Sequence, residues 1–181
     1  MTVKTPPHWD LSNIYPTLES AEFDAARKTF AIQIEQLEAL FTEKISATNA
    51  ETSVEKLANL AEEMTMRFNE SYELARTMSA YIYSFITTDS FNKLAMKTLS
   101  EFEQTEVRLR MLRTQAQQWV GSISALLPKI IKNSEVAKAH AFFLEETAEQ
   151  SKYLMSTKEE ALAAELSLSG SSGWEKLQGT I

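Results

Sequence analysis

A stretch from Thr52 to Asp89 contains no glycine and no proline, and its apolar residues recur at intervals of three and four. This spacing is typical of an amphipathic helix, and no residue in the stretch would interrupt one. The recurring apolar positions are Val54, Leu57, Ala61, Met64, Phe68, Tyr72, Ala75, Met78, Ile82 and Phe85. We therefore predict a helix over about residues 53–87, which at 1.5 Å per residue would be about 50 Å long.

A second long helix is predicted directly after the first, over about residues 90–120. Asp89 and Ser90 offer side-chain oxygens that can cap its start, and Gly121 marks its end. Its apolar positions are Phe91, Leu94, Leu99, Phe102, Leu109, Leu112, Ala116 and Trp119. Two long helices separated by a tight break predict an antiparallel helical hairpin.

The segments on either side of this hairpin are helical in pattern as well. Before it, an amphipathic pattern runs from Ser20 to about Thr48. After it, "SISALLPKIIKN" is predicted to be a short connection, because Pro128 disfavours a helical backbone at the residue before it. A further helix is expected over about residues 134–154.

The last part of the chain shows helix start and stop signals. Ser156 and Glu159 are spaced as a capping box, and Gly170 is placed as a C-terminal stop. Another helix begins on Trp174 and Leu177. These two residues and Ile181 would form one apolar stripe, so we expect residues 170–181 to be mobile or buried against another copy of the chain.

The whole pattern predicts an all-α fold, a bundle of about five or six helices with a long antiparallel hairpin. Only four glycines and four prolines occur in 181 residues, which favours long elements and short connections. The segment "HWDLSNIYP" is too short for a stable helix, and Pro16 closes it. We interpret residues 1–19 as an N-terminal clip that docks onto a helical lobe formed by residues 20–181.

The charge and composition exclude several classes of protein. With 18 basic and 25 acidic residues, the net charge of −7 argues against a nucleic-acid binder. Residues 90–138 are net basic between two acidic parts, which indicates either helix faces that attract one another or a functional basic wall. No apolar run is long enough to span a membrane, and no signal peptide or cysteine occurs, so a cytoplasmic location is the expectation.

No catalytic, cofactor-binding or metal site is predicted in this chain. The only histidines are His8 and His140, so the His-Glu-x-x-His pattern of zinc peptidases is absent. His140 is interpreted as a packing or surface histidine. The tyrosines Tyr72, Tyr81 and Tyr83 could line the wall of a peptide cleft, with packing in the core as the alternative.

Several of these segments together resemble the N-terminal region of the oligoendopeptidase F family of zinc metallopeptidases, which are similar to thimet oligopeptidase. The resemblance runs from Trp9 to Leu177 and includes "WDLSNIYP", "AYIYSFITTDSFN" and "YLMSTKEEALAAELSLSGSSGWEKL". Its most specific part is Tyr153 to Glu160, followed by Gly170 and Trp174. At Met155 the family tends to have leucine, which is a volume-conserving difference.

The resemblance implies that this chain is one lobe of a larger enzyme that cleaves oligopeptides. One zinc ion would be bound in a missing catalytic lobe, by a His-Glu-x-x-His helix and a downstream glutamate, and none of these ligands matches a position here. This lobe would gate substrate entry and be inactive alone. The expected partners are the catalytic lobe of the same polypeptide and oligopeptide substrates, with self-association of the truncated chain as a further expectation.

Four aromatic residues are expected to anchor the fold, namely Trp9, Tyr15, Trp119 and Trp174. In this view Trp9 and Tyr15 fasten the clip to the helical lobe.

The alternative function is a free-standing helical interaction module that binds a partner helix or dimerises.

Overall fold

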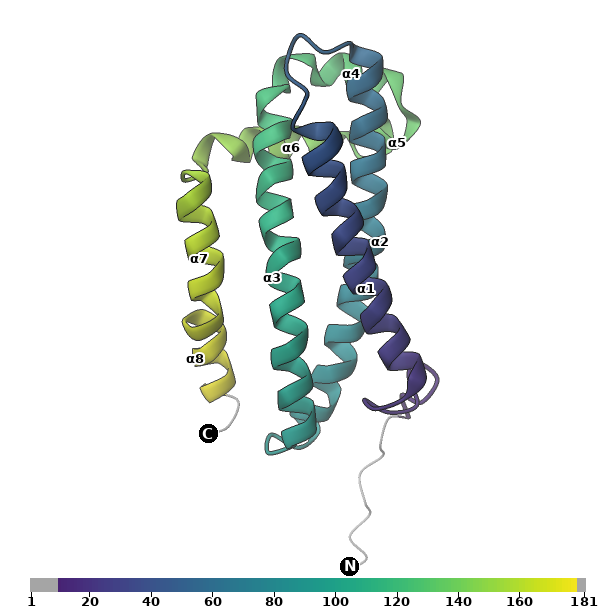
Figure 1. Ribbon diagram of the computed structural model, residues 1–181, viewed down its shortest axis with the longest axis vertical. Coiled ribbons are helices and arrows are strands. Elements are labelled where there is room, and N and C mark those ends of the chain that lie inside the picture. Colours follow the sequence, from purple (N-terminus) through teal and green to yellow (C-terminus); the bar gives the residue numbers. More distant parts are fainter. Residues whose placement is uncertain (1–9, 179–181) are drawn as a thin grey trace, which may run out of the picture.

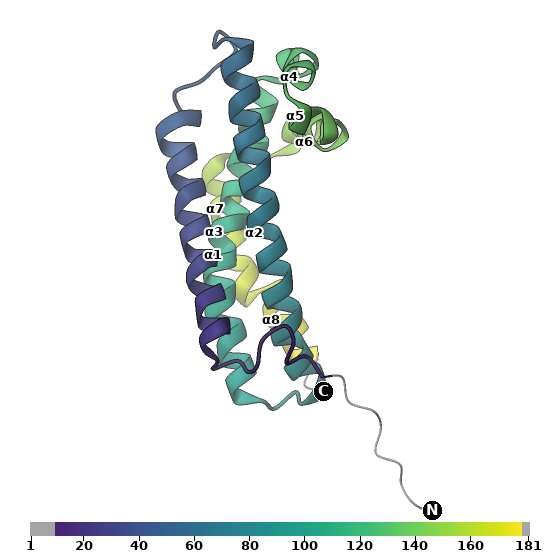
Figure 2. The same ribbon diagram turned by 90° about the vertical axis from the view of Figure 1, so that its right-hand side faces the viewer.

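A computed structural model describes residues 10–178 of the chain, and the prediction of an all-α fold is confirmed for these residues. Three long helices run side by side: α1 (Ala21–Ala39), α2 (Val54–Thr88) and α3 (Lys93–Ser122) (Figure 1). The short helices α4 (Leu127–Asn133), α5 (Glu135–Ala139) and α6 (Ala141–Gln150) lie across one end of α2 and α3 (Figure 2). The last two helices, α7 (Thr157–Ser169) and α8 (Ser171–Gln178), return along α3.

The predicted antiparallel hairpin is formed by α2 and α3, and its limits agree with the sequence pattern to within a few residues. The start of α3 differs, because Asn92 and not Asp89 or Ser90 is the N-cap. The Asn92 side chain accepts a hydrogen bond from the backbone N–H of Ala95 at 3.0 Å. Asp89 instead caps the end of α2, and its carboxylate accepts from the N–H of Phe91 at 3.0 Å. A helix reversal needs a few non-helical residues, which moves the start of α3 down the chain.

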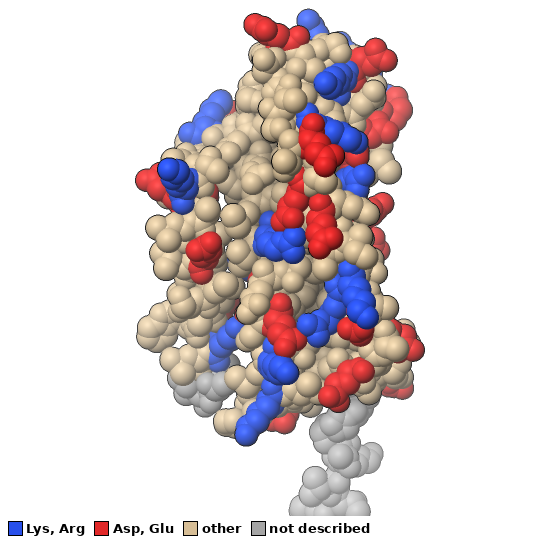
Figure 3. Space-filling view, viewed as in Figure 1, with Lys and Arg blue, Asp and Glu red and all other residues tan. Residues whose placement is uncertain are grey.

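The core lies between α1, α2 and α3. α1 continues into a π-helical turn (Leu40–Ile45), which contributes three buried side chains of its own. The largest fully buried side chains of the three long helices are Phe23, Phe30, Ile34, Leu37, Leu57, Met64, Met78, Ile82 and Leu109. Two ion pairs join α1 to α3 at the surface, Arg27 with Glu101 at 2.8 Å and Arg108 with Glu38 at 2.7 Å. Lys and Arg therefore alternate with Asp and Glu along this face (Figure 3).

The segment after Gly121 is more helical than we predicted. Leu127 has helical backbone angles despite the proline after it, and it begins α4. Proline is tolerated in the first turn of a helix, where its missing N–H has no partner to lose. Burial of Leu127 and Ile130 stabilises this turn. The single helix expected over residues 134–154 is divided at His140, which leaves the helical region between α5 and α6.

The described part of the N-terminal clip forms one turn that packs on the end of the bundle. The Asp10 carboxylate accepts a hydrogen bond from the N–H of Ser12 at 2.9 Å. Tyr15 is only 8% exposed, and its ring meets the rings of Phe23 and Tyr81 edge-on at 5.2 and 5.1 Å. The Tyr81 hydroxyl donates to the carbonyl oxygen of Tyr15 at 2.7 Å. The anchor predicted at Trp9 lies outside the described residues.

Replacing Tyr81 with phenylalanine should lower the free energy of unfolding by about 1 kcal/mol, because the buried carbonyl of Tyr15 loses its donor. This is the lower end of the roughly 1–3 kcal/mol that an unpaired buried acceptor costs, and we expect it because Pro16 and Tyr81, on either side of this bond, line a surface pocket. Urea unfolding measures the change. Tyr83→Phe is the matched control, because Tyr83 is exposed on the same helix. An equal loss in both variants would contradict the proposed role of the hydrogen bond.

The final two helices form an arm that rests on α3. The capping box predicted at Ser156 and Glu159 is present, and Gly170 caps the end of α7 as expected. Neither α7 nor α8 contains a fully buried residue, and Trp174 is 71% exposed. α8 is held by Lys176, whose ammonium group contacts the buried carboxylate of Glu103 on α3 at 2.5 Å. Trp174 is thus not an anchor within the core of this chain.

Lys176→Met should loosen α8 without unfolding the bundle. An ion pair near the surface contributes about 1 kcal/mol, so the amides of α8 should exchange with solvent roughly fivefold faster. The global cost stays small because water reaches Glu103 once α8 lifts away. Hydrogen exchange measures both effects, and Lys158→Met on α7 is the control. Faster exchange in α2 and α3 as well would show that the pair supports the whole bundle.

Candidate functional site

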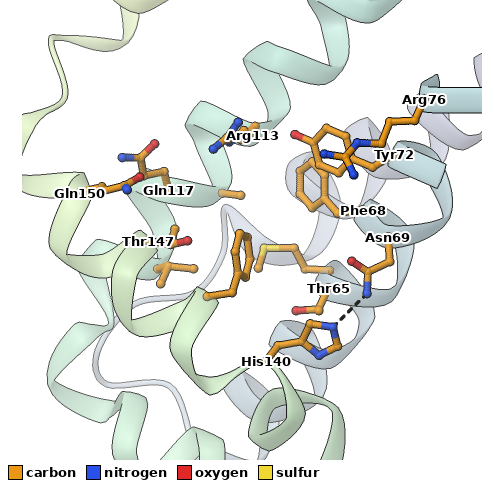
Figure 4. Close-up of a pocket in the computed structure, with 14 residues that line it drawn as sticks. Thr65, Phe68, Asn69, Tyr72, Arg76, Arg113, Gln117, His140, Thr147 and Gln150 are labelled. Atoms are coloured by element: carbon orange, nitrogen blue, oxygen red, sulfur yellow. Dashed lines mark hydrogen bonds between the residues drawn. The ribbon is translucent and has the colours of Figure 1, made fainter. Parts of the chain in front are cut away.

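A cavity of about 430 Å³ lies between α2, α3 and α6 (Figure 4). It exists because α4 and α5 turn the chain so that α6 packs against α3 beside α2. Its lining residues on α2 lie at positions 64, 65, 68, 69, 72 and 76, a spacing that places them on one helix face. The lining consists of Met64, Thr65, Phe68, Asn69, Tyr72 and Arg76 from α2, Arg113, Ala116, Gln117 and Val120 from α3, and His140, Phe143, Thr147 and Gln150 from α6 and its N-cap.

The base of this pocket is apolar. Met64, Phe68, Ala116 and Val120 are all buried, and they belong to the same core that holds α2 against α3. The ring of Phe68 stacks on the ring of Tyr72 with 5.9 Å between the centroids. An apolar base surrounded by a few polar groups is the usual construction of a small-ligand site.

His140 has a structural role at one end of the pocket. Its Nδ1 lies 2.9 Å from the carbonyl oxygen of Val136, and its Nε2 lies 3.1 Å from the amide nitrogen of Asn69. Because a carbonyl can only accept, Nδ1 carries the proton and Nε2 accepts from Asn69. The imidazole therefore connects the α5–α6 junction to α2, in agreement with its interpretation as a packing histidine.

Two arginines lie at the other end of the pocket, next to Tyr72 (Figure 4). Arg76 comes from α2 and Arg113 from α3, and none of the lining residues is acidic. Burial raises the pKa of the Tyr72 phenol above its ordinary value, and the positive charge of Arg113 opposes this rise. The Tyr72 hydroxyl therefore keeps its proton at neutral pH and can donate a hydrogen bond. This end of the pocket is positively charged and rich in donors.

The structure does not bring the three predicted cleft tyrosines together. Tyr72 lines this pocket, Tyr81 is buried in the core beside Tyr15, and Tyr83 lines another surface pocket that Glu175 and Lys176 complete. Tyr81 follows Tyr72 by nine residues, which corresponds to about two and a half helical turns. The two side chains therefore point in opposite directions, about 180° apart around the helix axis. Tyr83 points in nearly the same direction as Tyr72 but lies about 16 Å further along the helix.

Trp119 is buried at the end of α3, and its indole N–H donates to the Thr48 hydroxyl at 2.9 Å. This bond ties the connection after α1 to α3, so Trp119 occupies an anchoring position. The arginines of the pocket were not singled out from the sequence. They lie on separate helices, and only the distance between helices could have revealed their proximity.

Between residues 10 and 178, no group of three or more His, Asp or Glu side chains is arranged to hold a metal ion. Among the same residues, no helix combines the length and apolar character that a membrane span requires.

Residues 125–181 match the family model described as Oligopeptidase F, which covers the N-terminal domain of that family. The matched region includes α4 to α8, and so the α6 wall of the pocket, together with the specific segment from Tyr153 to Trp174. No curated protein and no solved structure matches the chain. Over residues 125–181 the match confirms the resemblance to the N-terminal region of the oligoendopeptidase F family, and it does not extend to residues 9–124.

Proposed function

We propose, from the match to the N-terminal domain of oligopeptidase F, that this chain is the substrate-gating lobe of a zinc-dependent metalloendopeptidase that hydrolyses oligopeptides. The match is the observation that carries the proposal. The zinc ion and its ligands would lie in a catalytic lobe of the same polypeptide, outside residues 1–181. The parent enzyme would act in the cytoplasm, as the absence of cysteine favours.

The shape of the lobe supports a gating role. α2 and α3 span 35 and 30 residues, so they form a stiff wall that could exclude folded proteins from a cleft while short peptides enter. Stiffness follows from the shared core, since both helices are buried along one side by α1.

The surface of the arm formed by α7 and α8 supports the proposal that a second lobe packs against this chain. The arm's surface in Figure 3 carries few charged side chains, and four of its large apolar residues are at least half exposed. These residues are Leu162, Leu166, Trp174 and Leu177. Apolar area left in water costs about 25 cal/mol per Å², which favours contact with another part of the polypeptide.

The test is to read the coding sequence on the 3′ side of the codon for Ile181. Peptidase activity is then measured for two proteins, the complete polypeptide and the present chain of residues 1–181. We expect a His-Glu-x-x-His segment downstream, and chelator-sensitive cleavage of a quenched oligopeptide by the complete protein. The present chain alone should be inactive. A reading frame without such a segment, or cleavage by the present chain, would contradict the proposal.

The exposed arm also favours a second candidate, a helical interaction module that self-associates or binds a partner helix through α7 and α8. Sedimentation of the chain at several concentrations, with Trp174→Ser and Leu166→Ser as variants, distinguishes the two. A concentration-dependent dimer that these substitutions abolish, in a protein without a downstream zinc motif, would favour the module.

A further inference from the structure

We propose that the pocket between α2, α3 and α6 binds the C-terminal carboxylate of a short peptide, with Arg76 and Arg113 as the carboxylate ligands and the apolar base holding the last side chain. The proposal goes beyond the gating function, because it concerns a site made entirely of this chain. It can therefore hold or fail whether or not a catalytic lobe exists.

The first argument is the pairing of the arginines. Each of the other four, Arg27, Arg67, Arg108 and Arg110, forms an ion pair with a glutamate. Arg76 and Arg113 are the two arginines for which the described residues provide no such pair, and both line the same pocket. A guanidinium group binds a carboxylate through two parallel hydrogen bonds, so two guanidinium groups without a carboxylate at one end of a pocket favour an anionic ligand.

The second argument is the local charge balance. No acidic residue lines the pocket, and, besides burial, the acidic residue Glu106 contributes to the raised pKa of Tyr72. The carboxylate of Glu106 is bound by Arg110 at 2.9 Å, and among the described residues no carboxylate forms an ion pair with Arg76 or Arg113. The protonated hydroxyl of Tyr72 adds a neutral donor beside them.

The third argument concerns the rest of the ligand. A cavity of about 430 Å³ is large enough for one or two amino-acid residues, since small-ligand sites span roughly 300–1,000 Å³. The apolar base formed by Met64, Phe68 and Val120 suits a large apolar side chain. Gln117 and Gln150 offer amide groups that can pair with a peptide backbone. Positive charge at one end and neutral amides elsewhere fit a peptide terminus better than an internal peptide segment.

Calorimetric titration tests this with N-acetyl-Leu-Phe as the free acid and as the C-terminal amide. We expect the free acid to bind at least about tenfold more tightly, because the amide removes the charge that two guanidinium groups recognise. Arg76→Gln and Arg113→Gln should each lower the affinity for the free acid by about tenfold or more. Both side chains are exposed and outside the core, so the variants should keep the melting temperature of the parent.

Arg108→Gln is the matched control, because it removes the same charge from α3 on the face that pairs with Glu38. Its affinity for the free acid should equal that of the parent. If Arg108→Gln weakens binding as much as Arg113→Gln does, only the overall charge matters and the proposal is wrong.

Two further ligands test whether the pocket recognises a peptide terminus, any small carboxylic acid or any anion. Phenylpropionate carries the carboxylate and an apolar ring without peptide bonds, and inorganic phosphate carries charge alone. We expect both to bind at least about tenfold more weakly than the acetylated dipeptide acid. Equal binding of phenylpropionate would assign the pocket to small carboxylic acids, and equal binding of phosphate would assign it to general anions. Either result overturns the peptide assignment, as does equal affinity for the acid and the amide.

Discussion

Phe30→Ala should lower the free energy of unfolding by about 3–5 kcal/mol, the largest effect that we expect from a single substitution. Phe30 is only 1% exposed, and its ring stacks on that of Phe102 across the contact between α1 and α3, with 5.6 Å between the centroids. The truncation leaves a cavity between two long helices, and stiff helices cannot collapse to fill it.

Urea unfolding at equilibrium measures this loss. Ile32→Ala serves as the control because Ile32 lies on the same helix and is 52% exposed, so its change should stay within about 0.5 kcal/mol. A small effect at Phe30 would mean that α1 is not packed against α3 as described.

Gly121→Ala should destabilise the protein by about 2 kcal/mol, although alanine is the better helix former. A Cβ atom at position 121 would lie 2.1 Å from Oγ and 2.6 Å from Cβ of Ser151, so the turn that follows α6 must move away from α3. Overpacking of this kind costs about 1–3 kcal/mol, and the upper end applies because the clash reaches a Cβ atom. The gain of about 1 kcal/mol in helix propensity offsets only part of this cost.

Two variants check that the close approach to Ser151 is the cause. At Gly173 a Cβ atom would lie 3.8 Å from the carbonyl oxygen of Leu168, which is an ordinary van der Waals contact. Gly173→Ala should therefore be neutral or stabilise α8 by up to about 1 kcal/mol. The double variant Gly121→Ala/Ser151→Gly should recover most of the stability, measured by urea unfolding. A Gly121→Ala protein as stable as the parent would show that the two segments are not in contact.

The long helices and their ends could be predicted from the sequence because they depend on local physics. The three-and-four spacing of apolar residues predicted α2 and α3, the same spacing from Ser20 onward predicted α1, and the capping box of Ser156 marked the start of α7. Each of these signals lies within a few residues of the structure that it specifies. The family resemblance was equally accessible, because its most specific segment is continuous from Tyr153 to Trp174.

The break at His140 and the helix that begins at Leu127 depended on contacts with distant residues. Leu127 and Ile130 are buried in the common core, which outweighs the local preference against a helical residue before proline. The imidazole of His140 pairs with Asn69, a residue 71 positions earlier in the chain. No local pattern reports such a pairing.

The pocket was decided by tertiary structure alone. Its two arginines are 37 positions apart in the sequence, at residues 76 and 113, and they line the same pocket only because the hairpin folds α3 back along α2. The opposite orientation of Tyr72 and Tyr81, by contrast, follows from the nine-residue spacing between them on one helix and is a local property. The sequence alone thus determined which segments are helices, because periodicity and capping act over one or two turns. Which side chains share a pocket was determined by packing between helices, because that energy depends on residues far apart in the chain.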